Sequence, residues 1–239
     1  MRRRRHCCCL GLAIVPLIAA GVFHFGGVLA KDRIEKEVAA RLPKLIGRAE
    51  SYTVVAHTNL LELSQGRIGS IDIHGERVDI DGQMTLQSLD ANLKDIRFDL
   101  GTRTPTRISS AQFSASMGPK DMTDYFSSRY PDVAGRGITL HDGYLTFAAK
   151  PEVGGFSLSL NADAKLHILD AARLVVDVTS VSAAGIKVPR IAGQYIEEKL
   201  NPVLDTNDWG VKASLDSVDV TPKAVTIRGK IELPKGRLL

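Results

Sequence analysis

From Tyr52 onward, apolar and polar residues alternate with a period of two, which predicts β-strands rather than helices. In Phe156–Ile168 seven apolar residues share one phase, so we expect a single strand longer than the common five or six residues. Ser88–Leu100 is also long, but its apolar residues change phase near Lys94-Asp95, which indicates a β-bulge or a sharp bend. Further strands are predicted at Ile108–Met117, Ile138–Ala149, Arg173–Ser182 and Val211–Val220.

Three segments have the period of an amphipathic helix. In Lys31–Ala49 apolar residues recur at spacings of three and four. Pro119–Arg129 and Pro189–Leu204 are shorter, and each begins with proline, a residue common in the first helical turn. Together with the one-sided strands, they predict an α+β fold: a long, highly twisted antiparallel β-sheet wrapped around a long N-terminal helix, with two short helices.

The first thirty residues differ from the rest of the chain. Arg2–Arg5 precede Cys7–Ala30, a stretch without formal charge that is long enough to span a hydrocarbon core of about 30 Å as a helix. Basic residues at its start predict the N-terminus inside and the domain outside. Val28-Leu29-Ala30 resembles a signal-peptidase site, so an uncleaved anchor and a cleaved signal peptide both remain open.

These boundaries predict four segments. They are a signal anchor or signal peptide (1–30), an amphipathic helix that packs on the domain (31–50), a β-rich domain (51–234) and a short tail (235–239). We expect a domain anchored to the cytoplasmic membrane on its extracytoplasmic side, or secreted if cleavage follows Ala30.

Charge and cysteine content narrow the function classes. The 31 Lys and Arg residues include Arg2–Arg5, so 27 remain against 27 Asp and Glu residues. A nucleic-acid-binding domain should carry a basic face, and none is evident, so we exclude nucleic acid as a partner. All three cysteines, at positions 7–9, lie in the leader, so the exported domain must be stable without disulfides.

The stretch Ser70–Gly82, SIDIHGERVDIDG, concentrates carboxylates and a histidine, which raises the possibility of a metal site. Ser217–Gly229, SVDVTPKAVTIRG, repeats its apolar positions and final glycine but few of its polar residues. The glutamate that closes an EF-hand loop is also absent. We therefore favour solvated strand edges over a metal site at Asp72, His74, Asp79 and Asp81. Each stretch is predicted to form two short strands, around turns at His74–Arg77 and Thr221–Ala224.

Catalytic motifs are not found. His141-Asp142 superficially matches the pair of HD phosphohydrolases, but Asp142-Gly143 is predicted to be a turn. No GxSxG elbow, HExxH pair or phosphate-binding loop is present. We predict a protein that is not an enzyme, with no catalytic residues and no cofactor; an envelope hydrolase is kept as a third hypothesis.

The remaining candidate is apolar surface on the concave side of the sheet and around the first short helix. It could be a packed core, or it could enclose a slot for acyl chains. Methionine is an adaptable lining for flexible ligands. The residues inferred from this apolar pattern as lipid-binding candidates are Phe98, Leu100, Phe113, Met117, Met122, Tyr125, Phe126, Phe147, Phe156 and Leu158.

Four stretches resemble, in order and spacing, the LmeA-like family of bacterial envelope proteins. They are GRIGSIDIHGERVDIDG, ISSAQFSASMGPKDMTDYF, ITLHDGYLTF and IKVPRIAGQYIEEKLNPVLD, and the similarity covers roughly 52–234. The resemblance implies phospholipid binding in the periplasm, linked in some actinobacteria to maturation of mannan-bearing lipoglycans. It also implies a fold related to the tubular lipid-binding superfamily, with a long twisted sheet wrapped on a helix.

Our leading hypothesis is non-enzymatic binding or shuttling of phospholipid or lipid-linked molecules in the cell envelope, with acyl chains in an apolar groove of the curved sheet. The alternative is a membrane-tethered structural or adaptor protein of the envelope, with a solid core and no lipid ligand. The expected partners are therefore an acyl lipid and, through the N-terminal segment, the membrane.

Overall fold

The computed structural model describes residues 31–80, 82, 84–101, 105–130, 137–149, 152–153, 156–157, 159–183, 185–209 and 212–232. The predicted leader, 1–30, and tail, 235–239, lie outside the described residues. Among the helices that are described, none is long and apolar enough to cross a membrane.

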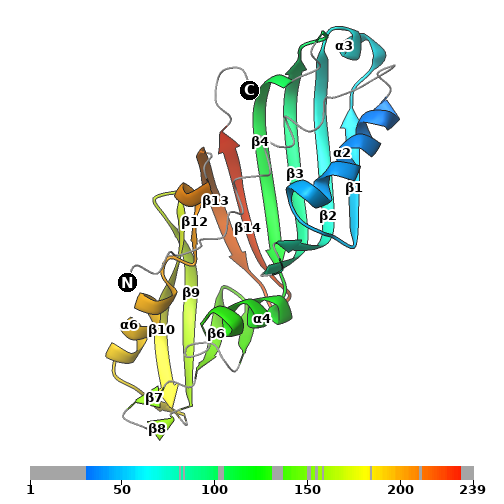
Figure 1. Ribbon diagram of the computed structural model, residues 1–239. Coiled ribbons are helices and arrows are strands. Elements are labelled where there is room, and N and C mark those ends of the chain that lie inside the picture. The colour runs from blue at the N-terminus through cyan, green and yellow to red at the C-terminus, as the bar shows by residue number, and fades with distance from the viewer. Residues whose placement is uncertain are drawn as a thin grey trace, which may run out of the picture.

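Two antiparallel sheets lie end to end in an elongated molecule (Figure 1). The first sheet has the order β1-β2-β3-β4-β14-β13, and the second has the order β11-β10-β9-β6-β5. The strands of the first sheet are β1 (Ser51–His57), β2 (Arg67–Ile80), β3 (Met84–Phe98), β4 (Pro105–Met117), β13 (Lys212–Val220) and β14 (Val225–Glu232). Those of the second are β5 (Ile138–His141), β6 (Tyr144–Ala149), β9 (Leu160–Leu169), β10 (Arg173–Ala183) and β11 (Ile186–Lys187).

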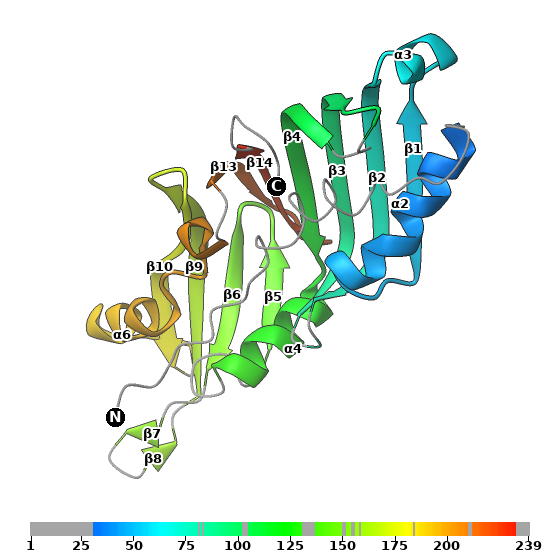
Figure 2. The same ribbon diagram turned by 45° about the horizontal axis from the view of Figure 1, so that its top comes forward.

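Helices cover one side of each sheet, as the turned view also shows (Figure 2). The long helix α2 (Lys31–Leu45) packs against β1, and the short helix α3 (Leu60–Ser64) follows β1. At the second sheet, α4 (Pro119–Arg129) packs near β5 and α6 (Ile191–Leu200) packs on β10. The smaller elements are β7 (Glu152–Val153), β8 (Phe156–Ser157), β12 (Leu204–Asp205) and the 3-10 helix η1 (Thr206–Trp209).

The predicted α+β class with mostly antiparallel sheet is confirmed, but the strands form two main sheets where one long sheet was expected. The physical reason lies at the end of β4, where Gly118 and Pro119 begin α4 and direct the chain out of the first sheet. The expected strand Phe156–Ile168 is also divided, because β8 pairs with β7 while β9 pairs with β6 and β10.

A crease crosses three neighbouring strands of the first sheet, and it confirms the bend predicted near Lys94-Asp95. On each strand, two successive buried residues are three positions apart instead of the usual two. On β3, Asp95 lies in this interval and has a positive φ of 49°. The residues on either side of this interval stand opposite one another across the strands, so β2, β3 and β4 bend along one line. They are Ile68 and Ile71 on β2, Leu93 and Ile96 on β3, and Ile108 and Ala111 on β4.

The turn predicted at His74–Arg77 is wrong, because β2 runs through this segment without interruption. Gly75 is buried inside the strand, where a Cβ would lie 2.7 Å from Cε1 of Tyr52, so the glycine serves close packing rather than a turn. Arg77 takes a positive φ of 52°, which shifts the phase of the buried residues. The reversal between β2 and β3 occurs instead around Gly82, which has φ 67°.

The second stretch does form the predicted hairpin. β13 and β14 pair around Thr221–Ala224, where the Thr221 N–H donates to the Ala224 carbonyl oxygen at 3.0 Å. Its last residue, Gly229, pairs with Phe113 of β4. A Cβ at Gly229 would lie 2.7 Å from Cζ of Phe113 and would collide with the backbone oxygen of Ser214. The two glycines that end the similar stretches therefore have different structural roles.

This difference generates a stability prediction. Gly229→Ala should lower the free energy of unfolding by about 1–3 kcal/mol, because an added methyl group in close-packed surroundings forces backbone and ring to move. Gly82→Asn should change it little, since nothing lies within 4 Å of a Cβ there and asparagine tolerates positive φ. Urea unfolding of both variants provides the measurement. Equal destabilisation by the two substitutions would contradict the packing role of Gly229.

Candidate functional site

The first sheet has an inner face, which packs against α2, and an outer face on the opposite side. The apolar residues under α2 are deeply buried and form the first core with Ile34, Val38 and Leu42 of the helix. A second core lies between α4, α6 and the second sheet. The inner face of β4, β14 and β13 continues from the first core to the second.

Between the two cores, several apolar side chains of the inner face are only half-buried, although Leu215 of β13 is buried. Ala115 pairs with Ile227 and Ile227 pairs with Val218, so these side chains form one row across three strands. Met117 packs against both cores and marks the point where they meet. We call this set the inner strip: Phe113, Ala115, Met117, Ala213, Val218 and Ile227.

The structure does not bring the ten predicted lipid-binding residues together. Phe98 is buried in the first core, while Phe113 and Met117 belong to the inner strip. Leu100 is 51% exposed beyond the end of β3. Met122, Phe126 and Phe147 are buried in the second core, and Tyr125 packs against that core. Only the backbone of Phe156 is described, in β8, and Leu158 lies outside the described residues.

The aromatic residues around α4 pack on one another. The ring centroid of Phe126 lies 5.7 Å from that of Phe147 and 5.3 Å from that of Tyr125, both edge to face. Phe147 is completely buried. The apolar side chains around α4 therefore form a packed core, one of the two interpretations of the apolar pattern.

Sequence reasoning did not single out four members of the inner strip, namely Ala115, Ala213, Val218 and Ile227. A signal was available, because Val218 and Ile227 occupy apolar positions of the stretch Ser217–Gly229. What was not available is the pairing of β14 with β4, which joins residues more than a hundred positions apart.

Of the four candidate metal ligands, Asp72 and His74 lie on the outer face and pair with other side chains there. Asp79 accepts a hydrogen bond from the N–H of Gly82, and Asp81 lies outside the described residues. His57 Nε2 lies 2.8 Å from Asp72 Oδ2, and Asn92 donates a hydrogen bond to the same carboxylate. His74 Nδ1 lies 2.6 Å from Asp90 Oδ1. Among the described residues, no three His, Cys, Asp or Glu side chains converge to hold a metal ion.

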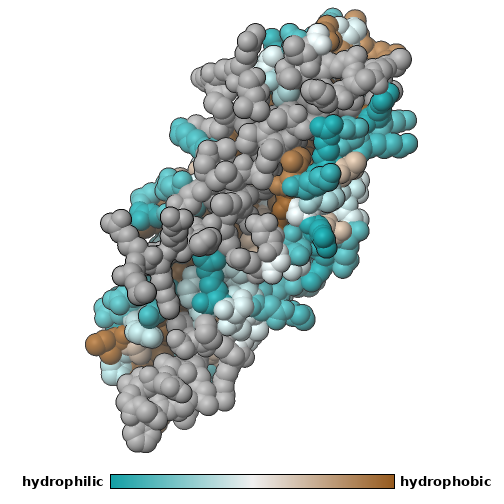
Figure 3. Space-filling model, in the orientation of Figure 1, coloured by the Kyte–Doolittle hydropathy of each residue, from teal (hydrophilic) through white to brown (hydrophobic). Residues whose placement is uncertain are grey.

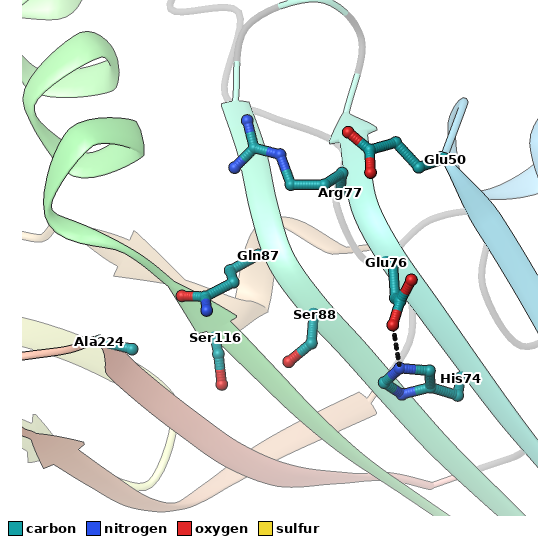
Figure 4. Close-up of a pocket in the computed structure, with 8 residues that line it drawn as sticks. All are labelled: Glu50, His74, Glu76, Arg77, Gln87, Ser88, Ser116 and Ala224. Carbon is teal, nitrogen blue, oxygen red and sulfur yellow. Dashed lines mark ion pairs between the residues drawn. The ribbon is translucent and has the colours of Figure 1, made fainter.

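Two shallow cavities are described, and both open on the outer face. One, of about 510 Å³, runs across the middle of the sheet and includes Asp72, His74, Asp90 and Arg228 in its lining. The other, of about 390 Å³, is lined mainly by polar residues from Glu50 to Ser116 (Figure 4). In that view the ion pair of His74 with Glu76 lies at one side of the cavity, and the guanidinium of Arg77 points away from this ion pair.

Arg77 connects the first sheet to α4. Its Nη1 donates to Asp121 Oδ2 at 2.7 Å, and Asp121 is only 7% exposed. A buried carboxylate requires such a partner, since an unpaired buried charge is strongly destabilising. The interaction therefore helps to hold α4, and with it the second core, against the first sheet.

His141 and Asp142 lie at the hairpin between β5 and β6. The His141 ring stacks on Tyr144 with centroids 4.4 Å apart, and its Nε2 lies 3.1 Å from Thr146 Oγ1. Asp142 is exposed in the two-residue turn between β5 and β6. The turn predicted at Asp142-Gly143 is confirmed.

The ion pair of His74 with Asp90 on the outer face predicts how stability depends on pH. The hydrogen bond to Asp90 raises the pKa of His74 above its usual value of 6.5, and the negative charges of Asp90 and Glu76 add to the effect. Because the folded pKa is the higher one, this ion pair stabilises the fold fully below pH 6.5 and ceases to do so as pH rises through the folded pKa. Asp90→Asn should return the His74 pKa toward 6.5 in an NMR titration of the imidazole; an unchanged titration would contradict the pairing.

No curated protein and no solved structure matches the chain. The model of the LmeA-like phospholipid-binding family matches residues 25–230, which is most of the chain. That family is described by the binding of phospholipid and not by a catalytic activity. The match confirms the resemblance seen in the sequence, and the chain belongs to the LmeA-like phospholipid-binding family.

Proposed function

We propose that this domain holds phospholipid without catalysis, with acyl chains lying along the inner strip. One observation carries the proposal: in a member of a phospholipid-binding family, the apolar row of Ala115, Ile227 and Val218 between the two cores is left half-buried. The residues of β4 that alternate with the strip, Gln112, Ser114 and Ser116, lie on the outer face and are polar. The two faces of this strand therefore differ in chemistry.

The energetic argument is the removal of apolar surface from water. Each methylene group that leaves water contributes about 0.8 kcal/mol, so an acyl chain and the inner strip stabilise one another by covering each other. Met117 at the junction of the two cores is suited to this contact, because its unbranched side chain adapts to flexible ligands. The headgroup would remain at a polar margin of the strip.

The cellular setting is part of the proposal. The charge-free stretch Cys7–Ala30 after four arginines supports a domain tethered outside the cytoplasmic membrane, where it binds or shuttles phospholipid or lipid-linked molecules. The position of α2 on the inner face supports a distant relation to folds in which a curved sheet wraps a helix. The adaptor alternative differs in one respect, since it requires an inner strip that contacts only protein.

A photo-crosslinking experiment separates the two. The full chain in vesicles that contain a phosphatidylcholine with a diazirine on one acyl chain should form adducts on β4, β13 and β14. Peptide mass spectrometry should map these adducts to the peptides that carry Met117, Val218 and Ile227. Adducts restricted to the first thirty residues would contradict acyl-chain binding by the strip and would favour the adaptor.

Two neighbouring residues of β4 provide a matched pair of variants, because Ala115 lies on the inner strip and Ser114 lines the outer cavity. Ala115→Asn should lower the adduct yield about fivefold or more, since an unpaired amide in apolar surroundings costs roughly 1–3 kcal/mol. Ser114→Asn should leave the yield unchanged. Circular dichroism of both variants controls for folding, and equal yields would oppose the proposed location.

A further inference from the structure

The end of the first sheet that carries α3 exposes three leucine side chains. Leu60 is 78% exposed, Leu61 is 67% exposed and Leu100 is 51% exposed. Leu100 lies close to the end of α3: a Cβ placed on Gly66, two residues after α3, would lie 3.6 Å from Cγ of Leu100. We call these three residues the leucine tip; Figure 3 shows apolar residues exposed at this end of the molecule, over α3.

The leucine tip is held in place rather than loosely attached. Asn59 and Glu62 cap the start of α3 reciprocally: the Glu62 N–H donates to Asn59 Oδ1 at 2.9 Å and the Asn59 N–H donates to Glu62 Oε2 at 3.2 Å. Leu63 anchors the helix in the first core. The helix thus buries one leucine and presents two others to solvent beside Leu100, and clustered exposed apolar side chains can mark an interaction surface.

A row of arginines borders the leucine tip on the outer face. Arg67 on β2 stands opposite Arg97 on β3, and Arg97 stands opposite Arg107 on β4. All three are exposed, and like charges directly opposite one another disfavour strand pairing. Such a row gains stability from an anionic partner.

One carboxylate lies among these three cations. Asp95 accepts a hydrogen bond from the Ser109 hydroxyl at 2.8 Å and lies 3.5 Å from Nη2 of Arg67. The pKa of Asp95 is lowered, first by Ser109 and then by the charges of Arg97, Arg67 and Arg107. Within the described part of the chain, neither Arg97 nor Arg107 forms an ion pair of its own, so the row retains a positive excess.

Apolar side chains beside arginines match the chemistry of an anionic bilayer surface. Leucine enters the boundary of the hydrocarbon, while arginine keeps its charge at the phosphate groups. We propose that the leucine tip and the arginine row dock this domain on a membrane surface that contains anionic phospholipid.

The start of α2 lies at the same end. The Glu35 carboxylate in the first turns of α2 accepts a hydrogen bond at 2.8 Å from the N–H of Ala56, near the end of β1. Figure 1 shows this end of α2 on the side of the molecule that carries α3. The apolar stretch Cys7–Ala30 directly precedes Lys31 in the sequence, so a tether there would bring this end of the domain to the bilayer.

The opposite end of the molecule offers a control. Ile186 is 74% exposed and Ile191 is 75% exposed, near Lys187, Arg190 and Lys199 around α6. This end also exposes two large apolar side chains beside three basic residues, but it lies far from the start of α2 (Figure 1). None of the docking residues belongs to the inner strip, so docking and lipid binding can be measured separately.

Depth-dependent fluorescence quenching tests the docking. The full chain with Trp209→Phe, which removes the single tryptophan, would carry either Leu61→Trp or Ile186→Trp. Each is reconstituted in vesicles of phosphatidylcholine and phosphatidylglycerol in equal parts, with bromine on the acyl chains. We expect strong quenching of the indole introduced by Leu61→Trp and little quenching of that introduced by Ile186→Trp.

Charge variants complete the experiment. Arg67→Gln, Arg97→Gln and Arg107→Gln together should lower the ratio of docked to undocked domain about 100-fold, since each arginine near an anionic surface contributes about 1 kcal/mol, or roughly fivefold. Lys187→Gln, Arg190→Gln and Lys199→Gln together should have no effect. In the chain that keeps its arginines, added salt should weaken the quenching, a readout that does not depend on the folding of the triple variant.

Quenching that is equal or stronger with Ile186→Trp would overturn the proposal, as would quenching from Leu61→Trp that is insensitive to both salt and the three arginines. Either result would leave the crosslinking to the inner strip unaffected. Conversely, lack of adducts on the strip together with quenching at the leucine tip would refute the proposed acyl-chain site and retain the docking surface.

Discussion

The pairing of β14 with β4 is the interaction on which the rest of this structure depends. It joins Val225 to Met117 and Ile231 to Ala111, residues more than a hundred positions apart in the chain. On the outer face a hydrogen bond of 2.9 Å between Ser116 and Thr226 supports the pairing. Without it β4 would be an open edge, and the inner strip would not continue onto β14 and β13.

The same pairing helps to connect the two sheets. β13 follows β14 in the order of the first sheet, and Val220 and Val225 at the hairpin contribute to the second core. The backbone oxygen of Val220 also accepts a hydrogen bond of 2.9 Å from Gly143, in the turn between β5 and β6. On the other side Arg77 of β2 binds Asp121 of α4. Each sheet is therefore fastened to the other by a strand hairpin and a helix.

The two faces of the first sheet differ in polarity, and its two ends differ in charge. The inner face is apolar and partly uncovered between the cores, while the outer face carries the carboxylates and histidines that first resembled a metal site. The arginines gather at one end of that outer face, beside the leucine tip. A protein that holds an apolar molecule and approaches an anionic surface needs both properties, and strand alternation allows one sheet to provide them.

Local patterns predicted the local elements well, because period and phase depend on neighbouring residues. The phase change at Lys94-Asp95 identified the crease, and the proline-initiated helix at Pro119–Arg129 is confirmed residue for residue. The turn at His74–Arg77 failed because Gly75 looks the same in sequence whether it serves a turn or close packing against Tyr52. Likewise, the seven apolar positions of Phe156–Ile168 could not show that the chain divides into β8 and β9.

The candidate site shows the same difference between what local patterns predict and what they do not predict. By itself, the sequence determined which residues are apolar, which strands have two unlike faces, and the family to which those patterns belong. Only the tertiary structure decided that Phe126 and Phe147 fill a core while Ala115, Val218 and Ile227 remain half-buried. The physical reason is that burial depends on what packs over a side chain, and here that is set by the long-range pairing of β14 with β4 rather than by any local pattern.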